Sequence, residues 1–462
     1  MDRRAFLAGA ALASVAGRVW AADVDDLRTA AREGWLYSLP LVEIGRLRAA
    51  IGGVGINAFA PIPMPAAGAP SDINAPEPGV LCASAWIDVS GGSATLHIPP
   101  ASGRYFTVTV MYMYSNVLEV LGSGAAGQDG GAFILQGPAP RMGVGGYTVP
   151  EPRLPSLHKV VKSHAPWVWA LARIQATGEG DRAAAQALLD SLEVHVKTPG
   201  GRAPVASTGP DANWSDYFYA AQKLIDENPP PPYETDFFRR IAPLQLGMAG
   251  GFERARFADA DLDQIADGAA DAQILAANLH PTDRVEAGWL WPRTDTVGYG
   301  QDFLYRAQTA LNGLGAPSAE HLLTLRAAAP DGGLAFPSDA HYRLALPTPP
   351  PVDGFWTLAL YEIAADGRLS PTANPLGRYG LGSHSDLRST STGEIDIWIG
   401  QADPGGAHTP NWLPAPAQGN FALVLRAYLP GPDFLSRNYR PPVVELLGPA
   451  QAPPTSPLRR RH

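Results

Sequence analysis

The chain has almost no cysteine: Cys82 is the single one among 462 residues. A disulfide bond within the chain is therefore excluded, whatever the redox state of the compartment. Cys82 lies in the apolar stretch VLCASAW, which is typical of a buried strand. A reactive thiol needs exposure and a nearby base, so we expect Cys82 to be a structural residue rather than a reactive one.

Several motifs with known chemistry are missing. The sequence contains no GxxxxGK[ST] segment, no GxGxxG opening a helix after a strand, and no HExxH, so nothing in it indicates a nucleotide site or a zinc protease. The segment GLGSHS at 380–385 places serine next to histidine but lacks the GxSxG pattern of a nucleophile elbow. His158 and His164 are six positions apart, which turns them to different faces of a helix, so we predict no metal site.

Clustered positive charge is scarce as well. The formal net charge is −9, and the only basic block is Arg459–Arg461, at the end of a proline-rich segment, 449–462, that we expect to be disordered. Nucleic acid is therefore not expected as a partner.

The chain begins with a short apolar segment rather than a long one. Its first 22 residues have a charged start, an apolar middle and a small-residue end, the layout of a cleaved export signal that is too short to span a bilayer. Arg3 and Arg4 resemble the start of a twin-arginine signal. We expect cleavage after Ala21 and a periplasmic or secreted protein with no transmembrane segment; the alternative is an uncleaved membrane tether.

Glycine and proline are abundant, with 49 and 46 residues, in a chain that is 45% hydrophobic and 17% charged. Frequent turns between short apolar runs favour β-sandwiches. We expect a first β-sandwich, preceded by a helix, within residues 23–160, and a second sandwich within a C-terminal domain at 291–448. The expected strands lie at 83–89, 94–99, 104–114, 132–138, 341–347, 354–363, 394–401 and 421–430.

The middle of the chain has helical periodicity, and we expect residues 161–290 to form a mostly helical connecting region. Trp214, Tyr217, Phe218, Ala221, Leu224 and Ile225 form one apolar stripe of a helix that ends at the prolines of 229–232. Further helices are expected at 23–39, where Pro40 should interrupt the helix, and at 163–175, 181–195, 259–279 and 301–314.

Two stretches of the sequence are written nearly twice. PPASGRYFTVTVMYMY at 99–114 resembles PPVDGFWTLALYE at 350–362, and FILQGPAP at 133–140 resembles IWIGQADP at 397–404. These echoes indicate two sandwiches of one design. They are explained either by a duplication or by the strand and turn chemistry that any antiparallel sandwich repeats.

The residues also resemble a known pairing of protein families. YSLPLVEIGRLR, SAWIDV, GRYFTVTVMYMYSNVLEVLG and ENPPPP are similar to the domain of unknown function 1254, and TDTVGYGQDFLYRA, PPVDGFWTLALYE, NPLGRYGLGS and NWLPAPAQGNFALVLRAY to the domain of unknown function 1214. The resemblance implies an exported bacterial protein, mainly β with a helical middle (α+β), built from two jelly-roll-like antiparallel β-sandwiches joined by a helical segment. It implies no reaction.

One segment departs from the family pattern. Where such proteins typically carry an Asn-x-Asp-Thr-x-Tyr segment before the SAWIDV strand, this chain has EPGVLC. Glu77, Gly79, Val80 and Cys82 therefore stand where Asn, Asp, Thr and Tyr are expected. A family site made from those side chains would be lost or rebuilt here.

Arginines in apolar surroundings are the first group of candidate site residues. Arg104 and Arg426 lie in or beside aromatic strands, and Arg173 and Arg306 lie in stretches expected to be helical. A buried guanidinium group needs a carboxylate or an aromatic face as a partner. Internal salt bridges, for instance with Asp88, Asp295, Asp302 or Glu362, and recognition of an acidic or hydroxyl-rich ligand both satisfy this need.

The segment 289–302 holds the densest group of aromatic and charged residues. Aromatic faces beside Asp and Arg are typical of sugar binding, and two carboxylates about 5–10 Å apart could serve hydrolysis; the alternative is a domain-joining segment whose tryptophans fill the interface. The candidate catalytic residues are Asp88, Asp295 and Asp302. The candidate ligand-binding residues are Arg104, Tyr105, Trp291, Arg293, Tyr299, Arg306, Arg378, Asn411 and Trp412.

Three functions follow from these patterns. The first is a protein that binds an envelope-associated or carbohydrate-like ligand at the junction of the two sandwiches, where concave pockets form. Whether it also processes that ligand is left open. The second is a hydrolase or lyase with a carboxylate pair. The third is a structural protein whose sandwiches assemble into homo-oligomers. The sequence names no cofactor.

Overall fold

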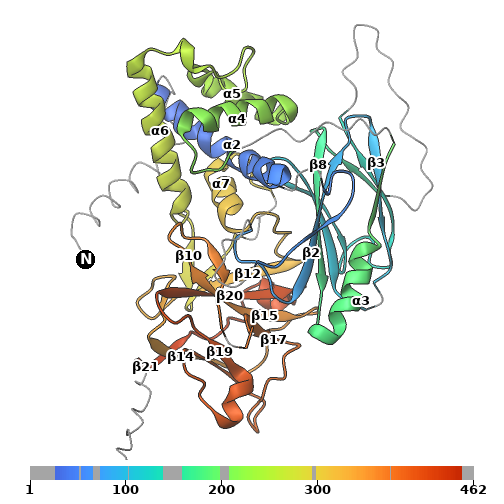
Figure 1. The fold of residues 1–462 in the computed structure, drawn as a ribbon, viewed down its shortest axis with the longest axis vertical. Coiled ribbons are helices and arrows are strands. Elements are labelled where there is room, and N and C mark those ends of the chain that lie inside the picture. Colours follow the sequence, from blue (N-terminus) through green and yellow to red (C-terminus); the bar gives the residue numbers. More distant parts are fainter. Residues whose placement is uncertain are drawn as a thin grey trace, which may run out of the picture.

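The computed structural model describes residues 26–50, 54–65, 73–101, 103–138, 159–197, 208–293, 298–374 and 376–449. Within these ranges a group of helices lies at one end of the molecule and two β-sandwiches form the rest (Figure 1). The predicted α+β class, antiparallel sheets with a helical region between them, is confirmed. The predicted export signal, the C-terminal tail from residue 450 onward, His158 and Asp295 lie outside the described residues.

The helical group is built around one long helix. The helices are α2 (Leu27–Ala50), α4 (Trp214–Glu227), α5 (Thr235–Arg240), α6 (Asp259–Ala277) and α7 (Phe303–Asn312). α4, α6 and α7 all pack against α2, and the predicted apolar stripe of α4 is confirmed, with Tyr217 and Phe218 fully buried in it. None of the helices in the described ranges combines the length and apolar character needed to cross a bilayer.

Pro40 does not end the first helix, and that prediction is wrong. α2 continues through Pro40 to Ala50, and nearly all residues from Ala30 to Gly45 are buried. Proline removes one N–H donor and disfavours a helix interior. Packing of the surrounding helices outweighs this loss, because most helical stability in proteins comes from tertiary contacts.

The first sandwich consists of two sheets. One has the order β1-β2-β8-β4-β5 and the other β7-β6-β3-β9. Leu96 and Phe133 from the second sheet meet Val108 and Ala170 from the first in a shared apolar core. The strands are β1 (Ala60–Ile62), β2 (Val80–Asp88), β3 (Ser93–Ile98), β4 (Phe106–Tyr112), β5 (Val117–Gly122), β6 (Gly131–Gln136), β7 (Val160–Lys162), β8 (Trp167–Gln175) and β9 (Glu193–Val196), and α3 (Glu179–Asp190) packs on β2 and β8.

The second sandwich is built in the same way. Its larger sheet has the order β10-β11-β12-β20-β15-β16, with β13 on β20 and β17 on β15, and its smaller sheet the order β19-β18-β14-β21. Trp356 and Leu425 pack with Leu344 and Ile397 in its core. The elements are β10 (Arg284–Glu286), β11 (Trp289–Trp291), β12 (Leu322–Ala327), β13 (Phe336–Pro337), β14 (Ala340–Leu346), β15 (Trp356–Ile363), β16 (Leu369–Pro371), β17 (Gly380–Gly382), β18 (Ile395–Gly400), β19 (Trp412–Pro414), β20 (Asn420–Tyr428), α8 (Pro432–Leu435) and β21 (Glu445–Pro449).

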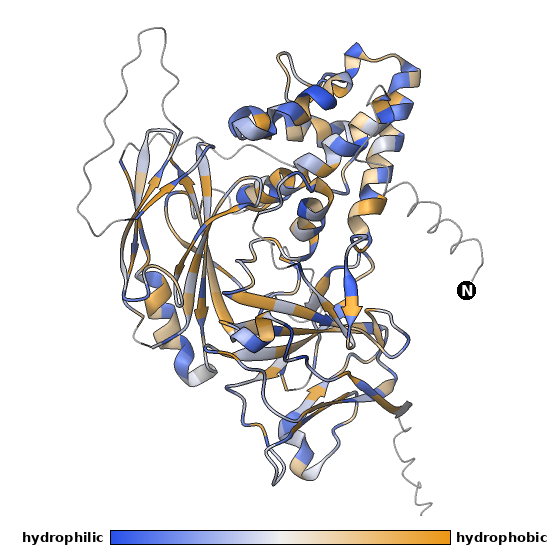
Figure 2. Ribbon diagram, turned by 180° about the vertical axis from the view of Figure 1, so that it is seen from behind, coloured by the Kyte–Doolittle hydropathy of each residue, from blue (hydrophilic) through white to orange (hydrophobic). Residues whose placement is uncertain are grey.

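The predicted helix at 163–175 is also wrong, because Trp167–Gln175 forms strand β8 in the middle of a sheet. Its two faces are both buried: Trp167 and Trp169 pack against the helices, and Ala170 and Ala172 face the core of the sandwich. A strand buried on both faces has no polar alternation, so its short apolar run resembles a buried helix. Figure 2 shows this apolar character along the strands of both sandwiches.

The two sandwiches share one topology. In chain order, β2 to β9 of the first correspond to β12, β14, β15, β16/β17, β18, β19, β20 and β21 of the second. Every matching pair of neighbours runs in the same relative direction, including the parallel pairs β6·β7 and β18·β19. The two echoes in the sequence fall on matching strands, β4 with β15 and β6 with β18, so the prediction of two sandwiches of one design is confirmed.

The match extends to single hydrogen bonds. Ser123, directly after β5, accepts a hydrogen bond on Oγ from the amide of Phe106 at 3.0 Å. Ser383, directly after β17, accepts the matching bond from the amide of Trp356 at 2.9 Å. Both serines donate their own amide to the carbonyl of the same strand residue. The register of the central strands can therefore be compared position by position.

Candidate functional site

A cavity of about 1110 Å³ lies between the two sandwiches. Its walls come from the outer faces of the large sheets, that is, from the sheet faces that do not point into either sandwich core. Helix α7 and the end of α6 close another side. Leu279, with 52% of its surface exposed, also lines the cavity, so the cavity is open to solvent there.

Strand pairing places matching residues on the two walls. In the first sandwich, Arg173 of β8 pairs with Cys82 of β2 and with Thr107 of β4. In the second, Arg426 of β20 pairs with Thr324 of β12 and Thr357 of β15. Neighbours across an antiparallel pair point to the same face. Each sandwich therefore presents an arginine with small polar or thiol side chains beside it.

Arg426 is tied into a buried ion pair. Its Nη1 donates to Glu77 Oε2 at 3.0 Å and to the Tyr361 hydroxyl at 2.7 Å, and its Nη2 donates to the carbonyl of Ala75 at 2.6 Å. Glu77 also accepts hydrogen bonds from the Thr357 hydroxyl at 3.0 Å and the Gly79 amide at 3.1 Å. The side chains of Glu77 and Arg426 are 8% and 10% exposed. Despite its burial, the pKa of Arg426 is raised, because the charges of Tyr361 and Glu77 outweigh the desolvation.

Arg173 has no such partner. Its Nη2 donates to the carbonyl of Gly315 at 2.8 Å, and its Nη1 makes a long contact of 3.4 Å with the Thr109 hydroxyl. Among the described residues, no carboxylate oxygen lies within 4.0 Å of its guanidinium nitrogens. Arg173 is half-buried and lines the cavity.

Within the described ranges, the side chains of two further arginines in the wall bond only to backbone carbonyls. Arg326 donates to the carbonyl of Leu334 at 3.1 Å, and its Nε is buried without a partner among the same residues. Burial lowers the pKa of Arg326. Arg378 donates to the carbonyls of Thr409 and Trp412, both at 2.8 Å. As far as the chain is described, the cavity wall therefore carries more positive than negative charge, since its acids there are Glu77, which is paired, and Asp283.

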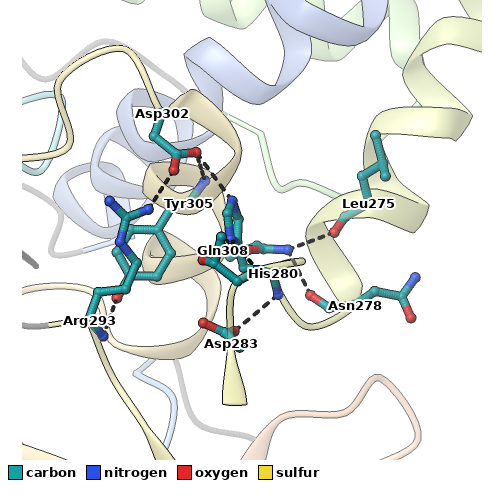
Figure 3. Close-up of polar contacts among 9 residues, drawn as sticks. Leu275, Asn278, His280, Asp283, Arg293, Asp302, Tyr305 and Gln308 are labelled. Carbon is teal, nitrogen blue, oxygen red and sulfur yellow. Dashed lines mark hydrogen bonds and ion pairs between the residues drawn. The ribbon is translucent and has the colours of Figure 1, made fainter. Parts of the chain in front are cut away.

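A polar cluster lies at the helical edge of the cavity (Figure 3). Asp302 caps α7 by accepting from the Tyr305 amide at 3.1 Å, and it pairs with Arg293 at 2.5 Å and with His280 at 3.4 Å. Burial alone would raise the pKa of Asp302, but hydrogen bonds from His280, the Tyr305 amide and Arg293 lower it overall. Asp302 is thus an ionised cap whose oxygens are occupied. Gln308 of α7 bonds to the carbonyls of Leu275 and Asn278, at the end of α6.

The predicted ligand-binding residues fall into two groups. Trp291 and Arg378 line the cavity. The others serve other contacts: Arg104 pairs with Asp181, Arg293 with Asp302, and Arg306 with Glu234. The members outside the cavity lining are Arg104, Tyr105, Arg293, Tyr299, Arg306, Asn411 and Trp412.

Three of these residues have clear structural roles. Arg306 is fully buried with Glu234 at 3.0 Å, against the ring of Tyr37. Asn411 bonds to the backbone of Arg388 and Asp396. The indole of Trp412 donates to the carbonyl of Gly400 at 2.9 Å. The polar groups of these three residues therefore bond to other groups of the protein, as the structural alternative to ligand binding expects.

The two candidate acids in the described part of the chain do not meet in the cavity. Asp88 lies at the far end of β2 from Cys82, where its Oδ1 accepts from the Ser90 amide at 2.9 Å, and Asp302 caps α7. Neither lines the cavity. Asp295 lies outside the described residues. The catalytic role of these three acids stays a prediction.

The thiol and the serine segment also have clear positions. Cys82 lines the cavity wall, and burial raises the pKa of its thiol although the charge of Arg173 opposes this. In GLGSHS, Ser383 holds the amide of Trp356 and Ser385 that of Gly382. His384 reaches the cavity and contacts the side-chain amide of Gln175. Both hydroxyls are therefore used by the backbone of a bend.

Sequence reasoning missed Glu77 as a site residue and treated it only as a departure from a family pattern. It also missed Thr324, Thr357 and Arg326. A signal was present, because LARIQ at 171–175 and VLRAY at 424–428 place an arginine at the same position of matching strands. In the described ranges no group of three His, Cys, Asp or Glu side chains is placed to hold a metal ion.

Comparison with known proteins finds two family models, one matching the region of each sandwich. Residues 56–195 match the model of a protein family of unknown function, DUF1254, and residues 322–432 match that of DUF1214. The VPA0106 protein from Vibrio parahaemolyticus is similar in structure, with a TM-score of 0.63 and 19% identity over 91% of this chain and 100% of that one, which shows a shared fold. An uncharacterised protein from Burkholderia cenocepacia gives a TM-score of 0.45 at 12% identity, over 94% of this chain and 98% of that one. No curated protein matches.

Proposed function

The chain belongs to the family that joins a DUF1254 domain to a DUF1214 domain, and we propose that it binds a small organic acid in the cavity between its two sandwiches. The observation that carries the proposal is the charge of the wall. Arg173, Arg326 and Arg378 all line the cavity, and none of them has a carboxylate of the described residues within 4.0 Å. Arginine in such a setting is suited to bind a carboxylate or a similar planar anion.

Burial makes these cations receptive to an anion. A guanidinium group removed from water loses solvation that backbone carbonyls replace only in part. The lowered pKa of Arg326 and its unpartnered Nε both reflect that loss. An anionic ligand would restore the missing interaction, which favours acids over neutral molecules of the same shape.

The rest of the wall favours an apolar body. Leu171, Leu322, Phe355, Val424 and Tyr428 line the same cavity. Its volume of about 1110 Å³ slightly exceeds the range of about 300–1,000 Å³ that is usual for small-molecule sites. We therefore propose a ligand with one acidic end and an apolar or ring-shaped remainder. Trp291 also lines the cavity, and an indole ring stacks on the apolar face of a sugar, so acidic sugars belong to the proposed ligand class.

We further propose that the protein acts outside the cytoplasm. The charged start, short apolar middle and small-residue end of residues 1–22 support export. Hydrolysis by a carboxylate pair is less well supported, because neither Asp88 nor Asp302 lines the cavity. Assembly into oligomers through the sandwich edges remains an alternative, and the mass of the purified protein in solution would test it.

Titration calorimetry on the purified mature chain tests the proposal. The probes are octanoate, 2-naphthoate and galacturonate, with octanamide, 2-naphthamide and galactose as neutral counterparts. We expect at least one acid to bind at least about tenfold more tightly than its neutral counterpart, with affinity falling as salt is added. Equal binding of acid and neutral probes, or no binding of any probe, would overturn the proposal.

A pair of variants locates the binding. Thr324→Phe adds a ring to the cavity wall on β12, and Thr95→Phe makes the same change on β3, which does not line the cavity. Thr324→Phe should weaken the acid that binds and Thr95→Phe should not. Equal effects of the two variants would place the acid elsewhere.

A further inference from the structure

The two walls of the cavity carry matching arginines in unequal states. Arg173 and Arg426 occupy the same register, each opposite a threonine of the next strand, Thr107 and Thr357. Each donates Nη2 to a carbonyl of a segment that leads into the large sheet of the other sandwich: Arg426 to Ala75 before β2, and Arg173 to Gly315 before β12. Each arginine thus bonds to the backbone of the other sandwich, and the two contacts are equivalent.

The equivalence ends at the carboxylate. The segment before β2 supplies Glu77 to Arg426. Counting back from the matched pair Cys82 and Thr324, the position of Glu77 corresponds to Ala319, and aligning the two AP dipeptides instead makes it Ser318. Neither residue carries a charge.

The nearest acid in that segment does not fill the place either. Glu320 has a side chain that is 70% exposed, and it bonds to the Ser318 hydroxyl and lies 3.7 Å from His321. The cavity wall therefore contains one complete ion pair, at Arg426, and one half of the same arrangement, at Arg173. The missing half is an anion.

We propose that Arg173 is the anchor for the acidic end of the bound molecule, whose carboxylate takes the place at Arg173 that the Glu77 carboxylate takes at Arg426. This inference rests on the proposed function and assigns one residue and one ligand group within it. The ligand class is a monocarboxylate whose apolar part extends from Arg173 along Leu171 and Leu314, both of which line the cavity. Cys82, on the paired strand, lies beside the anchored carboxylate.

The geometry of arginine adds a selection rule. A guanidinium group presents parallel N–H donors that match the two oxygens of a carboxylate, and a primary amide offers only one acceptor and no charge. The selection between octanoate or 2-naphthoate and its amide should therefore depend on Arg173. The other arginines of the wall attract the anionic ligand at longer range, and this attraction does not fix where its carboxylate binds.

The first test removes the anchor. Arg173→Gln, Arg326→Gln and Arg343→Gln each remove one positive charge. Arg326 lines the cavity, whereas Arg343 lies on β14, does not line the cavity and pairs with Asp396 of β18. With the acid probe that binds best to the wild type, we expect Arg173→Gln to weaken binding by at least about tenfold and to abolish the preference over the amide. Arg326→Gln should weaken binding by less, and Arg343→Gln should have no effect.

The second test supplies the missing carboxylate from the protein. Cys82→Asp places an acid opposite Arg173 in the sheet, with Cys82→Ser as the matched neutral control. Cys82→Asp should block the acid probe and leave the melting temperature at or above that of Cys82→Ser, because it gives the Arg173 guanidinium a carboxylate partner. This variant keeps the proposal testable even if Arg173→Gln fails to fold.

The outcomes separate the two proposals. If no acid binds to the wild type, the proposed function fails and Arg173 has no ligand to anchor. If an acid binds but Arg173→Gln and Arg326→Gln weaken it equally, or Cys82→Asp leaves it unchanged, the cavity binds acids and the anchor assignment is wrong. A direct readout is available in the wild type, because Cys82 is the only thiol. Once N-ethylmaleimide is shown to alkylate Cys82 in the ligand-free protein, bound octanoate or 2-naphthoate should slow that alkylation, and an unchanged rate would contradict placement at Arg173.

Discussion

Replacing Glu77 by glutamine should destabilise the whole molecule, because this one carboxylate connects the two sandwiches. Glu77 precedes β2 of the first sandwich, and it accepts hydrogen bonds from Arg426 and Thr357 of the second. Glutamine keeps the size of the side chain and removes its charge. Arg426, 10% exposed, would then keep only the Tyr361 hydroxyl and the Ala75 carbonyl as partners.

The magnitude follows from the burial of the pair. Removing one member of a buried ion pair costs about 3–5 kcal/mol, because the other charge stays buried without compensation. Glutamine can still accept the bond from the Gly79 amide, which is 3.1 Å from Glu77 Oε1, so we expect about 3 kcal/mol, the lower end of that range. This corresponds to roughly a hundredfold increase in the unfolding equilibrium constant.

Urea unfolding followed by tryptophan fluorescence measures this loss. Asp236→Asn is the control, because it breaks an ion pair with Arg239 in which both side chains are more than three-quarters exposed, and the midpoint should not move. The double variant Glu77→Leu with Arg426→Met should recover much of the loss, since an apolar pair of similar size avoids the buried charge. A loss below about 1 kcal/mol for Glu77→Gln, within the range of an exposed pair, would refute the reasoning.

Three further changes have defined outcomes. Trp356→Ala removes a core side chain that is 3% exposed and should cost about 3–5 kcal/mol in urea unfolding, more than Trp398→Ala, whose side chain is half-buried. Ser123→Ala and Ser383→Ala remove the same hydrogen-bond acceptor in the two sandwiches and should each cost about 1 kcal/mol; a large difference between them would contradict their structural equivalence. Burial raises the pKa of Tyr105 and Tyr361 to about 12, so the neutral phenols stabilise the fold fully below about pH 10, and this contribution is lost as the pH rises toward 12. The melting temperature should therefore fall above pH 10, and Tyr361→Phe should make the fall shallower.

Most of the fold could be predicted from the sequence, because its strands are separated by clear turn signals and its echoes mark matching strands. The echo of 99–114 in 350–362 identified β4 and β15. The two failures have one cause. At Pro40 and in Trp167–Gln175, burial on all sides overrides the local preference for a helix end or a helix.

The site was harder to predict, because it is made between elements that are distant in the sequence. Of the predicted ligand-binding residues, Trp291 and Arg378 line the cavity, and their role in binding stays a prediction. Arg306 was predicted for the same reason, as an arginine in an apolar stretch, but it forms a structural ion pair with Glu234. Local sequence cannot distinguish these cases, because the difference depends on whether a carboxylate reaches the guanidinium from elsewhere in the chain.

The presence or absence of a carboxylate partner also explains why the two walls of the cavity differ. Both walls have the same strand arrangement, so an arginine at the Arg173 and Arg426 positions is compatible with the sheet in either half. The second wall is neutralised by Glu77, which lies within the segment that departs from the family pattern. A carboxylate there fixes Arg426 as part of the scaffold, whereas Arg173, the matching arginine, has no carboxylate of the described residues beside it. If Glu77 were transferred to the other segment by combining Glu77→Gln with Ser318→Glu, Arg173 would become the paired residue, and octanoate or 2-naphthoate should lose its anchor there and gain one at Arg426. Acid binding that survives this exchange and is then weakened by Arg426→Gln rather than by Arg173→Gln would show that the position of one carboxylate decides which wall binds the acid.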